Sequence, residues 1–333
     1  MTSPKRGAMT TTHTTPAIAA VDLRKAYGEH RVLDGIDLRV GQGTVFGLLG
    51  PNGSGKTTTV QILSTLIAAD GGTIHVAGHD LARDPSAVRA SIGVTGQFSA
   101  VDTLLTGEEN LLLMAKLHHL GRAERRHRAT ELLEQFDLVD ARSKLVATYS
   151  GGMKRRLDLA MTLVGTPRLI FLDEPTAGLD PRSRRAMWQI VRELVAGGAT
   201  IFLTTQYLEE ADELADRVAV LDRGKLVAEG TPEELKRSIP GSHVILRFAN
   251  AHTLDMAAGL LGQPKRDDET LTLQVPGDGS VRALKELLDK LERASIEVEE
   301  LTGHSPNLDD VFLALTGHYH DGARAESEEE LAR

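Results

Sequence analysis

The feature that most constrains the fold of this chain is a run of nine residues in its first third. The run consists of Gly50, Pro51, Asn52, Gly53, Ser54, Gly55, Lys56, Thr57 and Thr58, and it fits the pattern Gly-x4-Gly-Lys-Ser/Thr. It follows an apolar segment, 43–49, which we predict to be a buried strand, and it opens a helical stretch that continues to residue 63. In such a loop, backbone N–H groups turn toward phosphate oxygens, and the helix N-terminus adds its positive end. We therefore predict a phosphate-binding loop between a strand and a helix.

Two groups of side chains indicate which ligand this loop binds. Lys56 supplies a positive charge for the β- and γ-phosphates of a nucleotide, and the Thr57 hydroxyl can ligate Mg²⁺. A second apolar strand, 168–172, delivers Asp173 and Glu174 at its carboxyl end, where α/β sheets bind ligands. We expect Asp173 to hold Mg²⁺ through its hydration shell and Glu174 to orient or deprotonate a water. Two acids after a strand are more often a solvated strand end, but the upstream loop favours ATP and Mg²⁺ as ligands.

Alternating apolar runs and helical stretches predict the fold class. The runs 168–172, 200–203 and 217–221, separated by helical stretches, indicate a mostly parallel sheet covered on both faces. Two further strands around a turn at Gly28 predict an N-terminal antiparallel β region. Helical spacing from about 98 to 165 indicates a helical subdomain inserted into this core. The prediction is an α/β protein with a nucleotide-binding core.

Changes in pattern predict where the parts begin and end. We expect a flexible leader at 1–16, the nucleotide-binding domain at 17–238, a small C-terminal α/β domain at 242–320 and an acidic tail at 321–333. Within the C-terminal domain, Leu308, Val311, Phe312 and Leu315 form one face of an amphipathic helix. We expect this stripe to pack on its own domain; contact with a partner is the alternative.

Composition excludes several classes of function. The net charge of −9 argues against nucleic acid as a partner, because phosphate backbones attract basic surfaces. The chain has no cysteine, so it has neither disulfides nor thiolate metal sites. The twelve histidines lack companions at metal-site spacing, so Mg²⁺ is the only metal expected. No apolar stretch is long enough to span a bilayer, and the first residues do not form a signal peptide.

Further motifs, in a fixed order from about 17 to 237, resemble the nucleotide-binding subunit of an ABC transporter. The phosphate-binding loop is followed at 149–153 by Tyr-Ser-Gly-Gly-Met, the position of the family's signature loop. The resemblance implies that Tyr27 stacks on adenine, that Gln97 senses Mg²⁺ and the membrane part, and that Asp180 lies in the loop that crosses the dimer interface. It also implies that Ser150, Gly151 and Gly152 contact the γ-phosphate of the ATP held by the other subunit. The predicted assembly is thus a homodimer joined through its ATP sites.

The sequence departs from the usual family pattern at three positions. Met153 replaces a frequent Gln, Tyr149 replaces a frequent Leu, and Gln206 stands where the family usually has a His. A Gln amide can donate a hydrogen bond to a phosphate oxygen, but it cannot become cationic or shuttle a proton. We expect Glu174 to carry the base role, Gln206 to be a neutral γ-phosphate contact, and turnover to be slow. The alternative is that Gln206 is only a strand-end residue. Arg155 and Arg156 are expected to be exposed charges on the signature helix.

These departures, with the ending 308–318, resemble the daunorubicin/doxorubicin-resistance type of ATP-binding subunit. The resemblance implies ATP hydrolysis that drives export of a hydrophobic drug or antibiotic through a separate integral-membrane permease. The chain would then lie at the cytoplasmic face of the membrane. Three alternatives remain: a soluble ABC ATPase that acts on ribosomes or DNA, an importer subunit with a regulatory C-terminal domain, and a module that uses ATP only as a switch.

Overall fold

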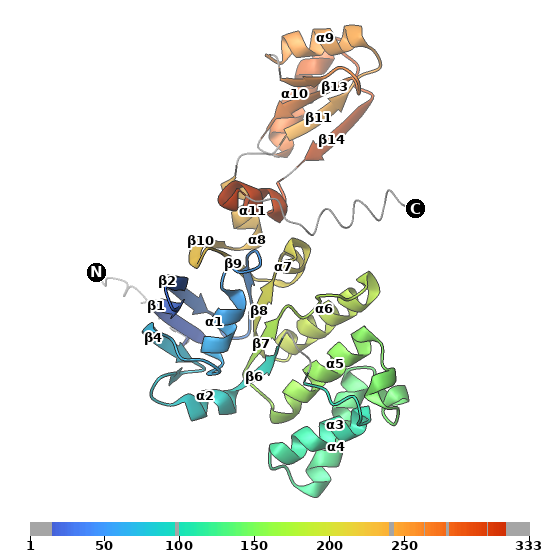
Figure 1. Cartoon of the computed structure of the whole chain (residues 1–333). Coiled ribbons are helices and arrows are strands. Elements are labelled where there is room, and N and C mark those ends of the chain that lie inside the picture. The colour runs from blue at the N-terminus through green and yellow to red at the C-terminus, as the bar shows by residue number, and fades with distance from the viewer. Residues whose placement is uncertain are drawn as a thin grey trace, which may run out of the picture. The chain divides into compact units, whose positions relative to one another are not determined.

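The computed structural model describes residues 15–96, 100–239, 243–262, 264–277, 280–304 and 306–317. Most of the expected leader, 1–14, and all of the expected tail, 321–333, lie outside these residues. The chain divides into two compact units, one ending at Thr231 and the other beginning at Pro232 (Figure 1). Each unit has its own hydrophobic core, so each is described separately.

A six-stranded sheet forms the centre of the first unit (Figure 1). Its strand order is β10-β9-β3-β8-β7-β6. The strands are β3 (Val45–Leu49), β6 (Ile92–Thr95), β7 (Leu169–Asp173), β8 (Thr200–Thr205), β9 (Arg217–Asp222) and β10 (Lys225–Gly230). Neighbouring strands are parallel except β10, which pairs antiparallel with β9. Every residue of β3, β7 and β8 is buried, as expected for strands covered on both faces.

A second, antiparallel sheet shares its core with one face of this sheet. Its order is β2-β1-β4-β5, formed by β1 (Ile18–Tyr27), β2 (His30–Val40), β4 (Gly71–Val76) and β5 (His79–Asp80). Helix α1 (Lys56–Leu63) contributes to the same hydrophobic core as both sheets. Phe202 belongs to that core, with its ring 5.7 Å from that of Phe46 and 5.6 Å from that of Phe171. Val60, Ile62 and Leu63 of α1 are buried in the same core, and the phosphate-binding loop lies between β3 and α1.

The predicted helical insertion is present between β6 and β7. It comprises α3 (Gly107–Leu117), α4 (Arg122–Gln135), η1 (Val139–Ala141), η2 (Val146–Thr148), α5 (Gly151–Thr162) and η3 (Leu163–Gly165). Figure 1 shows these green helices grouped beside β6. Thr106 and Glu109 form a capping box that sets the start of α3, and Ser150 caps α5. The helix that carries the signature loop is therefore positioned by its own first residues.

The remaining helices of the first unit are α2 (Pro85–Ser91), α6 (Pro181–Ala196) and α7 (Leu208–Leu214). Helix α6 buries Met187, Trp188, Val191 and Leu194, the spacing of a helix with one apolar face. Both α6 and α7 contact β8. The predicted fold class is confirmed. Strands β4 and β10 and helix α2 were not predicted, because their short segments alternate buried and exposed residues without a long apolar run.

The second unit contains a four-stranded antiparallel sheet of order β12-β13-β11-β14. Its elements are α8 (Pro232–Ser238), β11 (His243–Arg247), α9 (Ala251–Leu260), β12 (Lys265–Asp267), β13 (Thr272–Pro276), α10 (Val281–Arg293), β14 (Glu300–His304) and α11 (Leu308–Thr316). From β11 to β14 they follow a ferredoxin-like β-α-β-β-α-β order. Leu308, Val311 and Phe312 of the predicted stripe are buried, and α11 lies against α8.

Candidate active site

The phosphate-binding loop connects β3 to α1, as predicted, and its shape depends on two glycines. A Cβ on Gly50 would lie 2.3 Å from the Leu221 carbonyl oxygen, so this position has no room for a side chain. Gly55, at the start of α1, has a φ of +112°, a conformation that glycine adopts without strain. The Ser54 hydroxyl is buried and has no hydrogen-bond partner among the described residues. A tight cradle with an unpartnered hydroxyl fits a phosphate group.

Lys56 is held at the centre of this loop. Its side chain is only 4% exposed, and its Nζ donates to the Gly50 carbonyl at 2.8 Å and to the Pro51 carbonyl at 3.2 Å. The same Nζ lies 3.5 Å from Oε1 of Glu174. Burial lowers the pKa of the Lys56 ammonium, while the nearby carboxylates of Glu174 and Asp173 oppose that shift. The loop lysine and the acid pair therefore form one electrostatic cluster.

Asp173 lies at the carboxyl end of β7 and is buried. Its Oδ1 accepts a hydrogen bond from the Thr204 hydroxyl of β8 and lies 3.4 Å from the Thr57 hydroxyl. Carboxylate and hydroxyl oxygens are ligands that Mg²⁺ accepts. Asp173 and Thr57 are thus placed together as a magnesium site requires. Thr204, which sequence reasoning missed, orients the carboxylate; only its buried place at a strand end could have indicated it.

Glu174 follows directly and has an unusual backbone. Its φ is +48°, in the left-handed region that residues other than glycine seldom adopt. The Glu174 N–H donates to the carbonyl of Thr204 at 3.0 Å, which ties this turn to the neighbouring strand. Because the backbone turns here, the carboxylate is directed to Lys56 rather than away from the loop. The geometry places a carboxylate beside the phosphate-binding loop, where a general base would be needed.

Gln206 and Tyr27 lie at strand ends in the same unit. Gln206 directly follows β8 and is half-buried. Tyr27 ends β1 and is 52% exposed, with Nζ of Lys25 5.5 Å from its ring centroid. An exposed aromatic face is available for stacking on a base. Pro51 and Thr58 are half-buried, and Asn52 and Gly53 are exposed at the tip of the loop.

The signature loop is separate from this cluster. Ser150 and Gly151 are exposed, and the Ser150 hydroxyl accepts from the Met153 N–H at 3.3 Å. Among the described residues, Ser150–Gly152 form no hydrogen bond with the loop 50–58, and Figure 1 shows α5 well apart from α1. Asp180 caps α6 by accepting from the Ser183 hydroxyl and N–H, and the hydroxyl contributes most to the lowered pKa of Asp180.

The structure thus brings together Lys56, Thr57, Asp173 and Glu174, with Ser150, Gly151, Gly152 and Asp180 elsewhere on the surface of the same unit. Gln97 lies outside the described residues. No cluster of three or more His, Asp or Glu side chains suited to a metal occurs in the described part of the chain. Likewise, no helix in that part is long and apolar enough to cross a bilayer.

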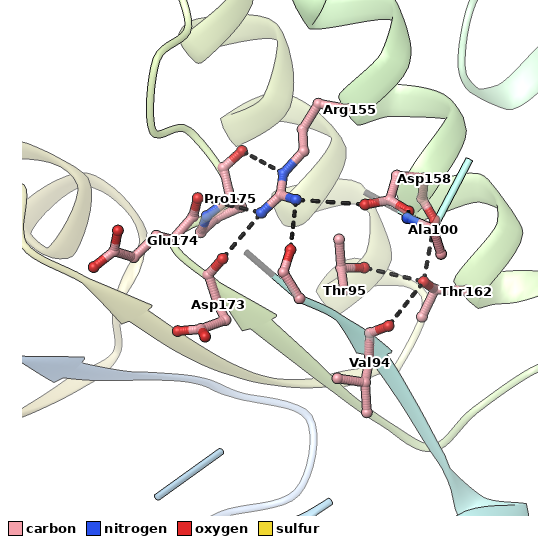
Figure 2. A network of polar contacts seen from close by, with 10 residues as sticks. Val94, Thr95, Ala100, Arg155, Asp158, Thr162, Asp173, Glu174 and Pro175 are labelled. Atoms are coloured by element: carbon pink, nitrogen blue, oxygen red, sulfur yellow. Dashed lines mark hydrogen bonds and ion pairs between the residues drawn. The ribbon is translucent and has the colours of Figure 1, made fainter. Parts of the chain in front are cut away.

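The expectation that Arg155 is an exposed surface charge is wrong. Its side chain is only 11% exposed, and its guanidinium donates to backbone carbonyls next to the acid pair (Figure 2). Arg156 is also largely covered, and it donates to the carbonyl of Phe136 at 2.8 Å. Helical spacing could not reveal either contact, because the partners are carbonyl groups of distant segments.

Comparison with known proteins agrees with this geometry. Residues 33–177 match the family described as ABC transporter, and residues 230–316 match the C-terminal domain of DrrA1-3-like ATP-binding proteins. Among solved structures, an ATP-binding subunit of an ABC transporter is similar with a TM-score of 0.60 and 32% identity, covering 67% of this chain and 92% of that one. A dimeric ATP-binding cassette in a post-hydrolysis state, bound to ADP and Pi, has a TM-score of 0.59 and 25% identity, covering 64% and 98%. The fold is that of an ABC ATPase.

Relatives that match nearly the whole chain identify a narrower family within the ABC ATPases. The daunorubicin resistance ATP-binding protein DrrA2 of Streptomyces coeruleorubidus is 51% identical, over 93% of this chain and 98% of the relative. The daunorubicin/doxorubicin resistance ATP-binding protein DrrA of Streptomyces peucetius is 48% identical, over 95% and 97%. The chain therefore belongs to the DrrA-like family of ABC transporter ATP-binding subunits, and it is an ATPase subunit of an efflux transporter.

Proposed function

We propose that this chain hydrolyses ATP to drive export of a hydrophobic drug or antibiotic through a separate membrane permease. The observation that carries the proposal is the convergence of Lys56, Asp173 and Glu174 at one edge of the sheet. The names of the similar proteins, which refer to daunorubicin and doxorubicin resistance, support the cargo class. An efflux role places the chain at the cytoplasmic face of the membrane, held there by the permease.

Each residue has a proposed role in hydrolysis. The Lys56 ammonium donates to oxygens of the β- and γ-phosphates, and backbone N–H groups of the loop 50–58 surround the same phosphates. Tyr27 stacks on the adenine. The Glu174 carboxylate accepts a proton from the water that attacks the γ-phosphorus, as the bond to the β–γ bridging oxygen breaks. The Gln206 amide donates to a γ-phosphate oxygen without changing its charge.

Mg²⁺ fits the site on the evidence of its oxygen donors. Thr57 and Asp173 would hold it, with Gln97 as the third expected contact. When bound, Mg²⁺ neutralises charge on the phosphate oxygens. Thr204 keeps the Asp173 carboxylate oriented by donating to Oδ1.

Two copies of the chain are proposed to complete each site. The exposed N-terminus of α5, with Ser150, Gly151 and Gly152, offers N–H groups and a hydroxyl to the γ-phosphate held by the other copy. Asp180 lies in the loop proposed to cross the same interface. We propose an ATP-binding domain from 17 to 231 and a small C-terminal domain, particular to this type of subunit, that begins at 232. The sequence pattern suggests a boundary at 238–242, but α8 belongs to the second compact unit.

The cargo assignment is testable in the cells that carry the gene. We expect deletion of the gene to raise intracellular daunorubicin after exposure to the drug, measured by its fluorescence. The wild-type gene should restore the low level, and a Glu174→Gln gene, which keeps the fold but lacks the base, should not. Unchanged drug accumulation in the deletion strain would reject this class of cargo, and full restoration by Glu174→Gln would separate export from hydrolysis.

A further inference from the structure

Arg155 makes the densest set of polar contacts near the acid pair. It lies in the second turn of α5, five residues after Ser150. Nε donates to the carbonyl of Pro175 at 2.8 Å, and Nη2 donates to the carbonyls of Asp173 at 3.0 Å and Glu174 at 3.2 Å. Figure 2 shows the guanidinium reaching from its helix into the turn formed by these three residues. One side chain therefore binds the backbone of the whole loop that carries the acids.

The third nitrogen of Arg155 binds a different strand end. Nη1 donates to the carbonyl of Gly96, directly after β6, at 2.8 Å. Strands β6 and β7 are parallel neighbours, so their carboxyl ends meet at the same edge of the sheet. Arg155 thus connects the signature helix to the ends of two adjacent strands.

Asp158, one turn further along α5, completes the arrangement. Its Oδ2 lies 3.4 Å from Nη1 of Arg155, and its Oδ1 accepts the N–H of Ala100 at 3.0 Å (Figure 2). The side chains of Arg155 and Asp158 are 11% and 4% exposed, respectively. Burial lowers the pKa of the Arg155 guanidinium, and the carboxylate of Asp158 is the largest influence that opposes this shift. A cation in this position is tolerated because it is paired and its donors are satisfied.

Only arginine suits this set of acceptors. The guanidinium offers five N–H donors in a rigid plane, whereas lysine offers a compact charge and glutamine offers two donors. The backbone it binds includes Glu174, whose φ of +48° requires support from its surroundings. Thr204 supplies that support on one side, through the Glu174 N–H, and Arg155 supplies it on the other, through the Glu174 carbonyl.

We propose that Arg155, supported by Asp158, is a positioning residue for ATP hydrolysis. It holds the turn 173–175 in the conformation that directs the Glu174 carboxylate to the phosphates, and it ties that turn to the helix that begins with the signature loop. The proposal rests on the proposed role of Glu174. Arg155 acts through the backbone of the acid loop and does not itself contact ATP.

The chain supplies a matched control. Arg156 is the next residue of the same helix, and it donates to the carbonyls of Phe136 and Asp137, away from the acid pair. The test compares Arg155→Lys with Arg156→Lys in the purified full-length protein, or in its complex with the permease if the native ATPase requires it. We measure kcat, KM for MgATP and the melting temperature.

We expect Arg155→Lys to lower kcat about 10- to 100-fold, because small misplacements of a catalytic group cost rates of this order. KM should change less than about threefold, because the loop 50–58 still binds the phosphates. Arg156→Lys should leave kcat within about twofold, whatever it does to the melting temperature, because its partners lie outside the acid loop. Equal losses of kcat in the two variants, or a native kcat in Arg155→Lys, would overturn the proposal.

If Arg155→Lys does not fold, Asp158→Asn decides the question. This change keeps the size of the side chain and an acceptor for the Ala100 N–H but removes the charge that faces Arg155. A lowered kcat with unchanged KM supports the proposal, and a native kcat refutes it. Glu174→Gln is assayed in parallel. If Glu174→Gln is active, Glu174 is not the base. If Glu174→Gln is inactive and Arg155→Lys is fully active, only the positioning role of Arg155 is rejected.

Discussion

The cluster formed by Lys56, Asp173 and Glu174, here called the acid cluster, differs from the signature loop. One chain holds all the residues of the acid cluster together, whereas the signature loop has no such partners within its own chain among the described residues. Lys56, Asp173 and Glu174 are largely buried and hold one another in place from two segments of the chain, the start of α1 and the end of β7. Ser150 and Gly151 are exposed at a helix N-terminus, and the Ser150 hydroxyl bonds only within its own helix turn among the described residues. The first region is preorganised before assembly, whereas the second has donors directed outward. This difference favours a site whose second half comes from another copy of the chain.

The largest effect on kcat should come from a substitution in the acid cluster. Glu174→Gln removes the proposed base while keeping its size, so we expect kcat to fall about 10²- to 10⁴-fold. MgATP binding should persist, because the amides and Lys56 are unchanged. Steady-state ATPase assays and equilibrium binding of a fluorescent ATP analogue measure the two quantities. Residual activity near the native rate would show that hydrolysis does not depend on this carboxylate.

A charge added to the exposed signature loop tests whether that loop faces the γ-phosphate held by a partner chain. In Gly151→Asp, an acid in the first turn suits the helix dipole, so the fold should be retained. The added charge would repel the γ-phosphate held by a partner, and we expect kcat to fall roughly 100-fold, as for the loss of one stabilising donor. Gly151→Asn, of the same shape but neutral, is the control and should lose much less. If the two variants turn over ATP at the same rate, the loop does not face a phosphate.

Tyr27 should affect binding rather than turnover. Stacking of a base on an aromatic ring contributes about 1–3 kcal/mol, so Tyr27→Ala should raise the Kd for ATP about tenfold. Tyr27→Phe keeps the ring and should bind nearly as the native chain does. Because the ring is 52% exposed, the melting temperature should not change. Equal ATP affinity in Tyr27→Ala and the native chain would remove Tyr27 from the site.

Gln206 should have a smaller effect on the rate. A neutral hydrogen bond contributes about 0.5–1.5 kcal/mol, so Gln206→Ala should lower kcat about 3- to 10-fold. Gln206→His should raise kcat, because an imidazole can add charge to the same contact. An unchanged rate in Gln206→Ala, with Glu174→Gln inactive, would leave Gln206 as a strand-end residue only.

The smallest expected effect is on the pH dependence of stability, through the buried carboxyl group of Glu210. Trp188 donates to Oε1 of Glu210 at 3.2 Å, and burial raises the pKa of this carboxyl above 4.5. The folded state therefore binds a proton that the unfolded state releases, so this group makes stability fall as pH rises above 4.5 toward the raised pKa. Glu210→Gln should remove that dependence. The melting temperature of the variant minus that of the native chain should increase with pH; a constant difference would contradict the shift.

Much of the acid cluster could be predicted from the sequence, because its residues belong to motifs that impose a local conformation. The loop 50–58 needs its glycines, and Asp173 and Glu174 end an apolar strand, so spacing alone places them at one sheet edge. Arg155 and Thr204 could not be predicted in this way. Their partners are carbonyls and a carboxylate brought close only by the tertiary fold. Strand β12, with three exposed residues, gave no apolar signal at all.

The most direct test of the shared site is a cross-link between the two halves. The chain has no cysteine, so Asn52→Cys and Gly151→Cys, both at exposed positions, can be introduced into separate Glu174→Gln chains. The two chains are mixed and treated with a short bismaleimide. We expect a cross-linked pair of one chain of each kind that forms with MgATP and not with MgADP. The absence of that pair with MgATP bound, or a cross-link within one chain when both cysteines are placed in it, would show that the two loops do not meet across a dimer.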